Sequence, residues 1–500
     1  MGEEAAREKM ARAQGSGKAV SVAPGIPGTL MTPMTSVASG IPVAPVLLRG
    51  ARLVDPAVGR DEVADILIEG GRIANIGPDL GSAADAHGQD GAPIVVECAG
   101  KIAAPGLVDI HVHLREPGRE DKETVATGTR AAAHGGFTGI AAMPNTSPVC
   151  DTGSKARFLR ERAAAEGLVR VYPIGACTVG SKGEALAEMG DMLAEGAVAF
   201  SDDGHGVQSA GMTRLVMDYA KQFGATVISH CEDEGLVGRG VVNEGSASTR
   251  LGLPGWPAAA EEIHAARDIR LAELTGCRLH LAHLSTAGSV GLVRAAKKRG
   301  ISVTCEVTPH HLFLDEGALG DAYDTNLKMN PPLRTAADRE ALVAALLDGT
   351  VDCIASDHAP HAPHEKALEF ELAPFGTTGL ETALPLMVTN LIGSSSCGTA
   401  GSLGGSNLPG SAGRLDWGTL VQLMAHGPRK VLGLSPVHLE KGAVADITVI
   451  DPEAEVPVVP EFFESRSANS AFLGTTLSGK ATEVLVGGRF ALRNGKVVGT

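Results

Sequence analysis

The sequence lacks several features that mark whole classes of protein. It contains no run of about 18 apolar residues, the minimum for a membrane-spanning helix. Acidic residues outnumber basic ones, and the net charge of −15 argues against a nucleic-acid partner. No G-x-G-x-x-G motif follows an early strand, so a dinucleotide site is not supported. Aromatic residues make up only 3% of the chain while glycine reaches 64 residues, which indicates tight turns and close packing on small side chains.

The cysteines show no C-x-x-C spacing that would indicate a disulfide framework or a zinc ribbon. Eight are scattered along the chain, and several, such as Cys305 and Cys353, lie inside apolar runs. Such thiols are typical of small buried side chains in a reducing compartment. The N-terminus begins Met1-Gly2-Glu3-Glu4 and shows no apolar core of the signal-peptide type. We therefore expect a cytoplasmic protein.

The length of 500 residues fits a folded protein of one large and one small domain, or of two ordinary domains. The hydrophobic share of 44% and the charged share of 20% are those of a soluble globular chain. Residues 1–45 are rich in Ala, Gly, Pro, Ser and Met without periodicity, which predicts a disordered N-terminal extension. Residues 393–414 are rich in Gly, Ser and Asn, which predicts a flexible surface insertion.

Both ends of the remaining chain have β-like patterns. Residues 46–105 and 431–500 consist of short apolar runs separated by turns, and Gly487-Gly488 indicates a hairpin turn. We predict that these two segments together form one small β-sandwich domain.

The middle of the chain, residues 106–430, alternates strand-like runs with helical stretches such as 123–134 and 258–274. A series of eight βα units predicts an α/β fold of the TIM type, a (β/α)8 barrel. A doubly wound open sheet is the alternative. The predicted strands lie near 107–112, 137–143, 169–175, 197–201, 226–231, 278–284, 301–307 and 351–357.

Polar residues of metal-ligand type stand at five of the eight predicted strand ends. In a barrel of this kind the chemistry lies at the C-terminal ends of the strands. His111 and His113 share one face, because side chains at i and i+2 of a strand point the same way. Asp202-Asp203 alone could be a turn and Asp357 a helix cap. Together these residues predict a metal site: His111, His113, Asp202, Asp203, His230, His283 and Asp357.

Three motifs carry a resemblance to a known family. They are Asp109-Ile110-His111-Val112-His113-Leu114-Arg115-Glu116-Pro117-Gly118, Met143-Pro144-Asn145-Thr146 and Ala355-Ser356-Asp357-His358-Ala359-Pro360-His361. Over residues 46 to 495 the chain resembles bacterial class I dihydroorotases of the amidohydrolase superfamily. The resemblance implies reversible cyclisation of N-carbamoyl-L-aspartate to (S)-dihydroorotate and water, a step of de novo pyrimidine (UMP) biosynthesis.

The resemblance also implies two Zn²⁺ ions per subunit. His111, His113 and Asp357 would hold one ion, His230 and His283 the other, and Asp203 with a hydroxide would bridge them. Many relatives use a carboxylated lysine as the bridge; here Asp202-Asp203 stands in that place, and spacing favours Asp203 by analogy. Asp357 would act as base and then acid on the zinc-activated water and the departing amide nitrogen.

Substrate binding is expected from residues around these ligands. Arg115, predicted on the strand face of His113, offers a planar fork for the substrate carboxylate, and Asn145 can donate to it. By resemblance the substrate also contacts His113, Asn330 and His361, and residues 361–376 form a mobile lid that ends at Phe375 and Gly376. His280, His310 and His311 are expected to be structural.

Two alternatives stay open from the sequence. An allantoinase or dihydropyrimidinase would be expected to have a lysine at strand four and to lack Arg115 with Asn145. An inactive homologue serving as a scaffold for aspartate transcarbamoylase would be expected to lose metal-site histidines. Expected partners are a small-molecule substrate, with no nucleic acid and no membrane. A homo-oligomer and association with aspartate transcarbamoylase are compatible with the resemblance.

Overall fold

The computed structural model describes residues 44–80, 92–392 and 415–499. The predicted insertion 393–414, and all but the last residues of the predicted extension 1–45, lie outside the described residues. Within the described ranges no helix has the length and apolar character to cross a membrane. The seven described cysteines are buried and unpaired.

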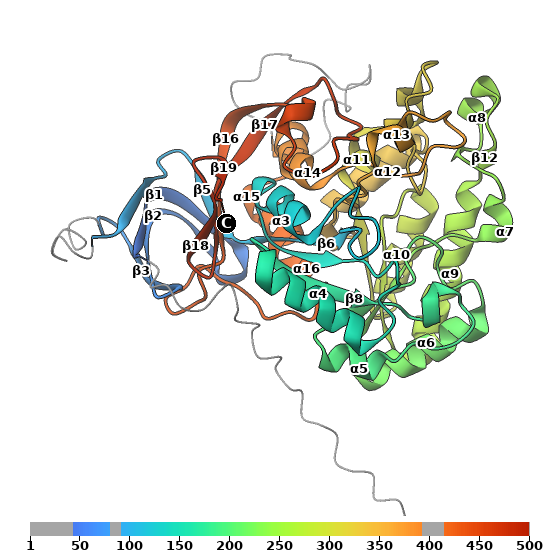
Figure 1. The fold of residues 1–500 in the computed structure, drawn as a ribbon, viewed down its shortest axis with the longest axis horizontal. Coiled ribbons are helices and arrows are strands. Elements are labelled where there is room, and N and C mark those ends of the chain that lie inside the picture. The colour runs from blue at the N-terminus through green and yellow to red at the C-terminus, as the bar shows by residue number, and fades with distance from the viewer. Residues whose placement is uncertain (1–43, 81–91, 393–414, 500) are drawn as a thin grey trace, which may run out of the picture. The chain divides into compact units, whose positions relative to one another are not determined.

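An eight-stranded sheet of parallel strands with helices around it forms a TIM-type barrel, as the sequence predicts (Figure 1). Each strand pairs with the next along the chain, from β6 to β15. The seam between the first and last strands is bridged by Val112 and His358, and the His113 N–H donates to the His358 carbonyl at 2.9 Å. The strands are β6 (Leu107–Val112), β7 (Phe137–Ala142), β8 (Arg170–Gly175), β9 (Ala199–Phe200), β10 (Thr226–Ser229), β13 (Arg278–Leu281), β14 (Val303–Val307) and β15 (Cys353–Ile354).

The barrel strands are apolar because helices cover their outer faces. Every residue of β6 and β7 is buried, as expected for parallel strands shielded on both sides. Strands β9 and β15 are only two residues long, and the polar residues Ser201 and Ser356 follow within two residues of their ends. Asp203 and Asp357 therefore lie just beyond the ends of these two strands, at the rim of the barrel.

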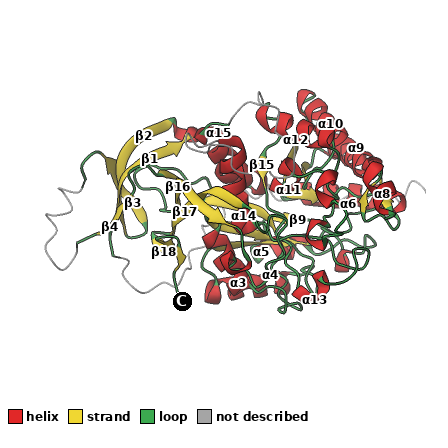
Figure 2. Cartoon of the chain, turned by 90° about the horizontal axis from the view of Figure 1, so that it is seen from above, coloured by secondary structure: helices red, strands yellow, loops and turns green. Residues whose placement is uncertain are grey.

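Helices alternate with the strands and surround the barrel in Figure 2. Thr124 caps the first of them by accepting a hydrogen bond from the Thr127 N–H at 3.1 Å. The longest, α9, ends at Gly276 in left-handed conformation. The larger helices are α3 (Val125–His134), α4 (Gly153–Glu166), α5 (Met189–Ala194), α6 (Ala210–Gln222), α9 (Ala258–Thr275), α10 (Ala287–Lys298), α12 (Ala336–Leu347), α14 (Leu380–Met387) and α16 (Gly427–Leu432).

Shorter elements fill the loops at the strand ends. A two-stranded sheet pairs β11 with β12, and π-helical turns extend two of the late helices. These elements are α7 (Glu234–Val237), β11 (Val242–Asn243), α8 (Ser246–Leu251), β12 (Gly255–Trp256), α11 (Pro309–Phe313), α13 (Pro363–Lys366), η5 (Val388–Ile392), α15 (Trp417–Val421) and η7 (Gln422–His426).

The two chain ends share one nine-stranded sheet, separate from the eight-stranded sheet of the barrel. The predicted joining of the two ends is therefore present, in the form of a single sheet. Leu48, Ile66 and Leu485 belong to the core of this terminal sheet. Gly487 and Gly488, both with positive φ, turn the predicted hairpin. The strands are β1 (Val46–Asp55), β2 (Arg60–Glu69), β3 (Arg72–Gly77), β4 (Ile94–Glu97), β5 (Ile102–Pro105), β16 (Ile447–Pro457), β17 (Thr476–Val486), β18 (Arg489–Arg493) and β19 (Lys496–Val497).

Gly106 is the single residue between the terminal sheet and the first barrel strand. A Cβ at this position would lie 2.2 Å from the Thr138 hydroxyl, so the close approach requires glycine. Across the same junction the Arg170 guanidinium bonds both carboxylate oxygens of Asp446, at 2.8 and 2.9 Å. The strand that carries the His-x-His motif is therefore held rigidly at its start.

Candidate metal centre

The His-x-His motif lies at the end of the first barrel strand, with Asp109 behind it. Asp109 is fully buried and accepts hydrogen bonds from the His111 and Ser356 N–H groups, both at 3.0 Å. Burial raises the pKa of Asp109 to about 6, although these hydrogen bonds oppose the change. Asp109 thus ties the first strand to the loop after the last one, which carries Asp357.

Asp203, three residues after the end of β9, lies against all four candidate histidines. Its Oδ1 is 3.3 Å from His111 Nε2, 3.4 Å from His230 Nδ1 and 3.7 Å from His283 Nε2. Its Oδ2 is 3.5 Å from His113 Nε2. Burial raises the pKa of this carboxyl group, but the surrounding histidines outweigh burial and hold the pKa well below its ordinary value.

Asp202 points away from this group although it is the next residue. It accepts hydrogen bonds from the backbone N–H groups of Cys177 and Thr178, at 2.8 and 3.1 Å, and from the Thr178 hydroxyl. Both of its oxygens are therefore occupied by the loop after β8.

Asp357 contacts the histidines of the first strand. Its Oδ1 lies 3.2 Å from His113 Nε2 and 3.7 Å from His111 Nε2. Asp357 has φ 47° and His283 has φ 31°. Left-handed backbone in non-glycine residues is costly and concentrates at functional sites.

Arg115 lies beside this cluster but not on the predicted strand face. Strand β6 ends at Val112, and Arg115 follows in a turn with φ 59°, so the alternation argument does not extend to it. Its Nε donates to the Pro360 carbonyl at 3.3 Å. Burial lowers the pKa of Arg115 to about 10, against the attraction of Asp357 and Asp203, so the guanidinium stays charged at neutral pH.

Asn145 lies between a histidine and a carboxylate of the cluster. Its Oδ1 is 2.9 Å from His113 Nδ1, and its Nδ2 donates to Asp203 at 3.3 Å. The amide therefore orients His113 so that Nε2 faces the two aspartates.

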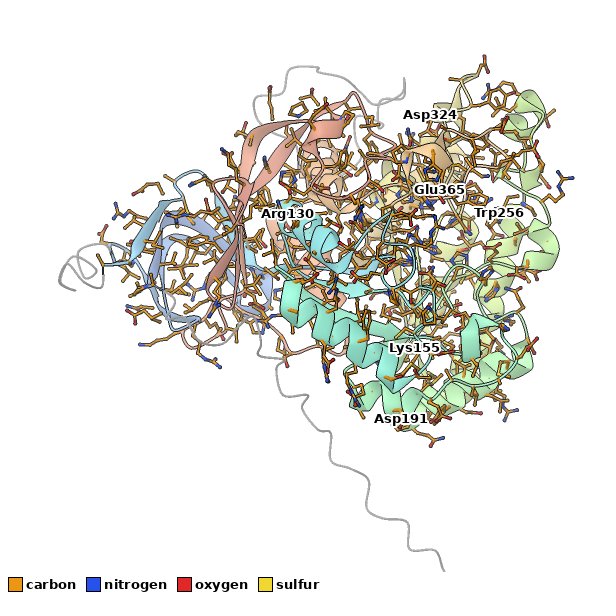
Figure 3. All side chains as sticks on the ribbon, in the orientation of Figure 1. Arg130, Lys155, Asp191, Trp256, Asp324 and Glu365 are labelled. Carbon is orange, nitrogen blue, oxygen red and sulfur yellow. The ribbon has the colours of Figure 1, made fainter. Side chains whose placement is uncertain are left out.

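His361 is held in one tautomer by its neighbours. The Lys122 ammonium, which can only donate, lies 3.2 Å from Nδ1, so Nε2 carries the proton and donates to the Phe375 carbonyl at 2.7 Å. Burial, together with Arg115 and Lys122, lowers the pKa of His361 to about 2, so the ring is neutral. Glu365, labelled in Figure 3, pairs with the same lysine at 2.9 Å.

The other histidines near the rim differ in their contacts. His311 bonds the Thr308 hydroxyl at 2.8 Å and the Pro331 carbonyl at 2.9 Å. His280 bonds the Thr304 hydroxyl at 2.8 Å. Among the described residues the buried His310 Nε2 has no hydrogen-bond partner.

Comparison with known proteins identifies the family. Residues 100–289 match the family model described as dihydro-orotase-like. The dihydroorotase of Pelotomaculum thermopropionicum is 50% identical over 450 residues, which cover 90% of this chain and 99% of that protein. The dihydroorotase of Geobacter sp. strain M21 is 48% identical over 451 residues, covering 90% and 100%. The chain belongs to the dihydroorotase family.

Solved structures agree with this assignment at the level of fold. The L-hydantoinase (dihydropyrimidinase) of Arthrobacter aurescens superposes with a TM-score of 0.77 at 25% identity, covering 91% of this chain and 97% of that one. The D-hydantoinase of Thermus sp. superposes with a TM-score of 0.74 at 26% identity, covering 91% and 97%. The dihydroorotase chain therefore shares the TIM-barrel architecture of the amidohydrolase superfamily.

The dihydroorotase family is metal-dependent, and the buried groups of this chain fit a metal. His111, Asp203 and His283 form one group whose ligand atoms all lie within 4.8 Å, and His111, His113 and Asp357 form another. His111 Nε2 and Asp203 Oδ1 are buried without a hydrogen-bond partner in the described structure. Buried polar atoms are rarely left unpaired, so both atoms fit the role of metal ligands.

Glu306, at the end of the seventh strand, belongs to this dihydroorotase centre and was not predicted. Its Oε1 is 2.7 Å from His111 Nδ1 and accepts from the His283 N–H at 3.2 Å. Its Oε2 is 3.1 Å from His280 Nε2. Burial raises its pKa, but His111 and His280 outweigh burial and lower the pKa to about 2. A lone glutamate inside the apolar run 303–307 was the available signal.

Glu232 plays the corresponding part for His230 and was also missed. Its Oε2 is 2.8 Å from His230 Nε2, which leaves Nδ1 facing Asp203. The Asn330 amide donates to the same carboxylate at 3.1 Å. Carboxylates of this kind orient metal-binding histidines in many sites.

Proposed function

We propose that this chain is an active dihydroorotase, which cyclises N-carbamoyl-L-aspartate to dihydroorotate with loss of water and catalyses the reverse reaction. The observation that carries the proposal is the contact of one carboxylate, Asp203, with four buried histidines, next to Asp357. Near-complete coverage of the curated dihydroorotases at 45–50% identity supports the same activity. All four histidines are in place, which argues against an inactive scaffold.

The proposed metal is a pair of zinc ions, because imidazole and carboxylate are preferred zinc ligands. His111, His113 and Asp357 would hold one ion, and His230 and His283 the other, with Asp203 shared between them. The contacts divide in the same way: those found for Asp357 are with His111 and His113, whereas Asp203 reaches all four histidines. When bound, the zinc ions would supply an activated water and polarise the amide carbonyl.

Asp357 is the proposed acid and base. Burial raises its pKa, but the His113 hydrogen bond and the charge of His111 outweigh burial and leave the carboxylate ionised at neutral pH. An ionised carboxylate can take a proton during attack on the ring amide and return it to the departing nitrogen. The left-handed backbone at Asp357 directs this carboxylate into the centre.

Arg115 is the proposed anchor for the substrate carboxylate, which an uncharged cyclic amide such as dihydrouracil lacks. A charged, partly buried guanidinium recognises a carboxylate through two parallel hydrogen bonds. Asn145, Asn330 and His361 are proposed to line the same pocket, with residues 361–376 as the lid over it. In this arrangement the neutral His361 fixes Phe375, and Gly376 follows directly.

The decisive experiment assays the zinc-loaded protein on dihydroorotate, carbamoyl aspartate, dihydrouracil and allantoin. We expect interconversion of the first two compounds and at least about 100-fold lower kcat/KM on the others, because a lost charged contact costs about 3 kcal/mol. Turnover of dihydrouracil or allantoin with no action on dihydroorotate would reject the proposal in favour of a sister cyclic amidase.

Arg115→Met tests the basis of this selectivity. We expect the variant to lose about 100-fold in kcat/KM on dihydroorotate, since the charged contact is worth about 3 kcal/mol. Its low activity on dihydrouracil should stay unchanged, because that compound has no carboxylate to contact. Equal losses on both substrates would assign Arg115 a structural role instead.

A further inference from the structure

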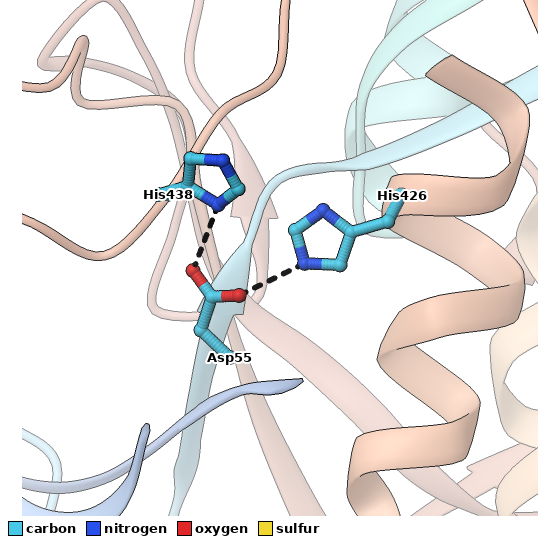
Figure 4. A group of neighbouring side chains, drawn as sticks. All are labelled: Asp55, His426 and His438. Atoms are coloured by element: carbon cyan, nitrogen blue, oxygen red, sulfur yellow. Dashed lines mark hydrogen bonds and ion pairs between the residues drawn. The ribbon is translucent and has the colours of Figure 1, made fainter. Parts of the chain in front are cut away.

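Two histidines and a buried aspartate meet at a second place in the molecule, away from the metal centre (Figure 4). Asp55 ends strand β1 of the terminal sheet, His426 ends the π-helical turn η7, and His438 lies in the segment after α16. Asp55 Oδ1 is 2.9 Å from His426 Nε2, and Asp55 Oδ2 is 3.5 Å from His438 Nδ1. The three ligand atoms lie within 4.8 Å of one another.

These separations are close to those of a tetrahedral zinc site. With each ligand atom about 2.0–2.1 Å from the ion, neighbouring ligand atoms in a tetrahedron lie about 3.3 Å apart. The His426 contact is slightly shorter than this value and the His438 contact slightly longer, and each is made to a different oxygen of Asp55. An ion between the two rings would therefore be held, after small side-chain rotations, by one nitrogen of each histidine and by the Asp55 carboxylate through one or both of its oxygens.

The contacts around Asp55 favour a metal site over a simple ion pair with the two histidines. The Asp55 carboxylate is fully buried, and the Ala57 and Leu439 N–H groups donate to its two oxygens at 3.1 and 2.9 Å, which fixes its orientation. His438 Nδ1 is buried and makes no hydrogen bond within the described structure. A histidine held for an ion pair alone would direct an N–H at the carboxylate at shorter range.

The helix geometry next to Asp55 is unusual, and one of the two rings reaches solvent. His426 ends a π-helical turn, and such turns occur often at functional sites. His438 remains about a quarter exposed, which leaves room for water as a fourth ligand.

We propose that Asp55, His426 and His438 form a further divalent-metal site, of the zinc class, that joins the terminal sheet to the last helical segment of the barrel. Binding would replace the ring protons that face the carboxylate, and these protons would pass to solvent. The site is separate from the catalytic centre, and its role is to hold two parts of the fold together.

The test counts zinc ions in the full chain after chelation and stepwise reloading. We expect wild-type protein to bind one equivalent more than His438→Gln, measured by metal analysis after gel filtration. Cobalt reloading should show the same difference in visible absorbance, as a tetrahedral site absorbs strongly. Because only the difference between the two proteins is used, the result does not depend on how many ions the catalytic centre takes.

His364→Gln is the matched control, because His364 is an exposed histidine on α13 away from Asp55. It should bind as much zinc as wild type. His426→Gln provides a second route if His438→Gln folds poorly, and should lose the same single equivalent. Equal zinc content in wild type and both site variants would overturn the proposal and leave a structural ion pair.

Discussion

At the scale of single residues, the neighbours Asp202 and Asp203 have different contacts and therefore different expected roles. Asp203 faces four histidines, while Asp202 is bonded to the loop after β8. Asp203→Asn should lose at least one zinc ion and nearly all turnover. The neutral amide lacks the negative charge that the Asp203 carboxylate would share between two ions. Asp202→Asn should keep both ions and lose about 1–3 kcal/mol of stability, the cost of unpaired buried donors.

Metal analysis and urea unfolding of the two variants check this prediction. Both substitutions are isosteric and remove one charge, so each serves as the control for the other. Two tightly held ions in Asp203→Asn, together with zinc loss in Asp202→Asn, would reverse the assignment.

Glu306 gives a second prediction for one residue. Its Oε1 bonds His111 Nδ1 and the His283 N–H, and its Oε2 bonds His280, so we assign it a positioning role. Glu306→Gln should weaken zinc affinity by about 10–100-fold, as loss of such partners does elsewhere. Competition with a chromogenic chelator measures this affinity. Unchanged affinity, with only a lower melting temperature of the metal-free protein, would mean that the residue is merely structural.

Among single residues, the sequence pattern was most informative for His111 and His113. Their i, i+2 spacing predicts that both face one side, and both rings contact Asp203, at 3.3 and 3.5 Å. Glu306 and Glu232 could not be assigned in this way, because their partners lie on other strands and only folding brings them together. Their burial as charged residues was the one local signal.

At the scale of elements, the position of the proposed lid, residues 361–376, depends on contacts outside the barrel strands. Gly376 has φ +123°, and a Cβ there would meet Ala359 Cβ at 2.6 Å. Asn469, from the C-terminal part of the chain, donates to the Gly376 carbonyl at 3.2 Å and accepts from the His361 N–H at 3.0 Å. The proposed lid, residues 361–376, is therefore bonded to a segment distant in sequence.

Gly376→Ala should disturb the lid more than backbone strain alone would. Gly349 also has positive φ, but a Cβ there meets nothing within 4 Å, so Gly349→Ala reports the strain, about 1–2 kcal/mol. Gly376→Ala should cost more in urea unfolding and raise KM about tenfold, a loss of about 1.4 kcal/mol in binding. Equal stability losses with unchanged KM would show that the lid does not depend on this contact.

Strand order was predictable from the alternation of apolar runs, yet strand ends were not. The predicted strand face was extended to Arg115, but β6 ends at Val112 and a left-handed turn follows. A positive φ in arginine has no sequence signature, since tertiary contacts such as the bond to Pro360 impose it.

At the scale of the whole molecule, the barrel seam and the terminal sheet differ in what stabilises them. Strand β6 is joined to the loop after β15 by the Val112–His358 bridge, by the bond from the His113 N–H to the His358 carbonyl, and by the Asp109 carboxylate, which accepts from the Ser356 N–H. The terminal sheet instead has continuous ladders and its own apolar core. The proposed catalytic ions would join ligands from both sides of the seam, His111 and His113 on one side and Asp357 on the other.

Metal removal should therefore open the molecule locally. With free zinc a thousandfold above its dissociation constant, binding stabilises the folded state by about 4 kcal/mol, and chelation removes that stabilisation. Hydrogen exchange should speed up at the ends of β6 and β15, while β17 and β18, the strands of the terminal sheet away from Asp55, keep their protection in the same sample. His438→Gln is the control for the further site, because zinc should still protect the seam in that variant. Unchanged exchange at the seam after complete chelation would show that the barrel closes without its metals.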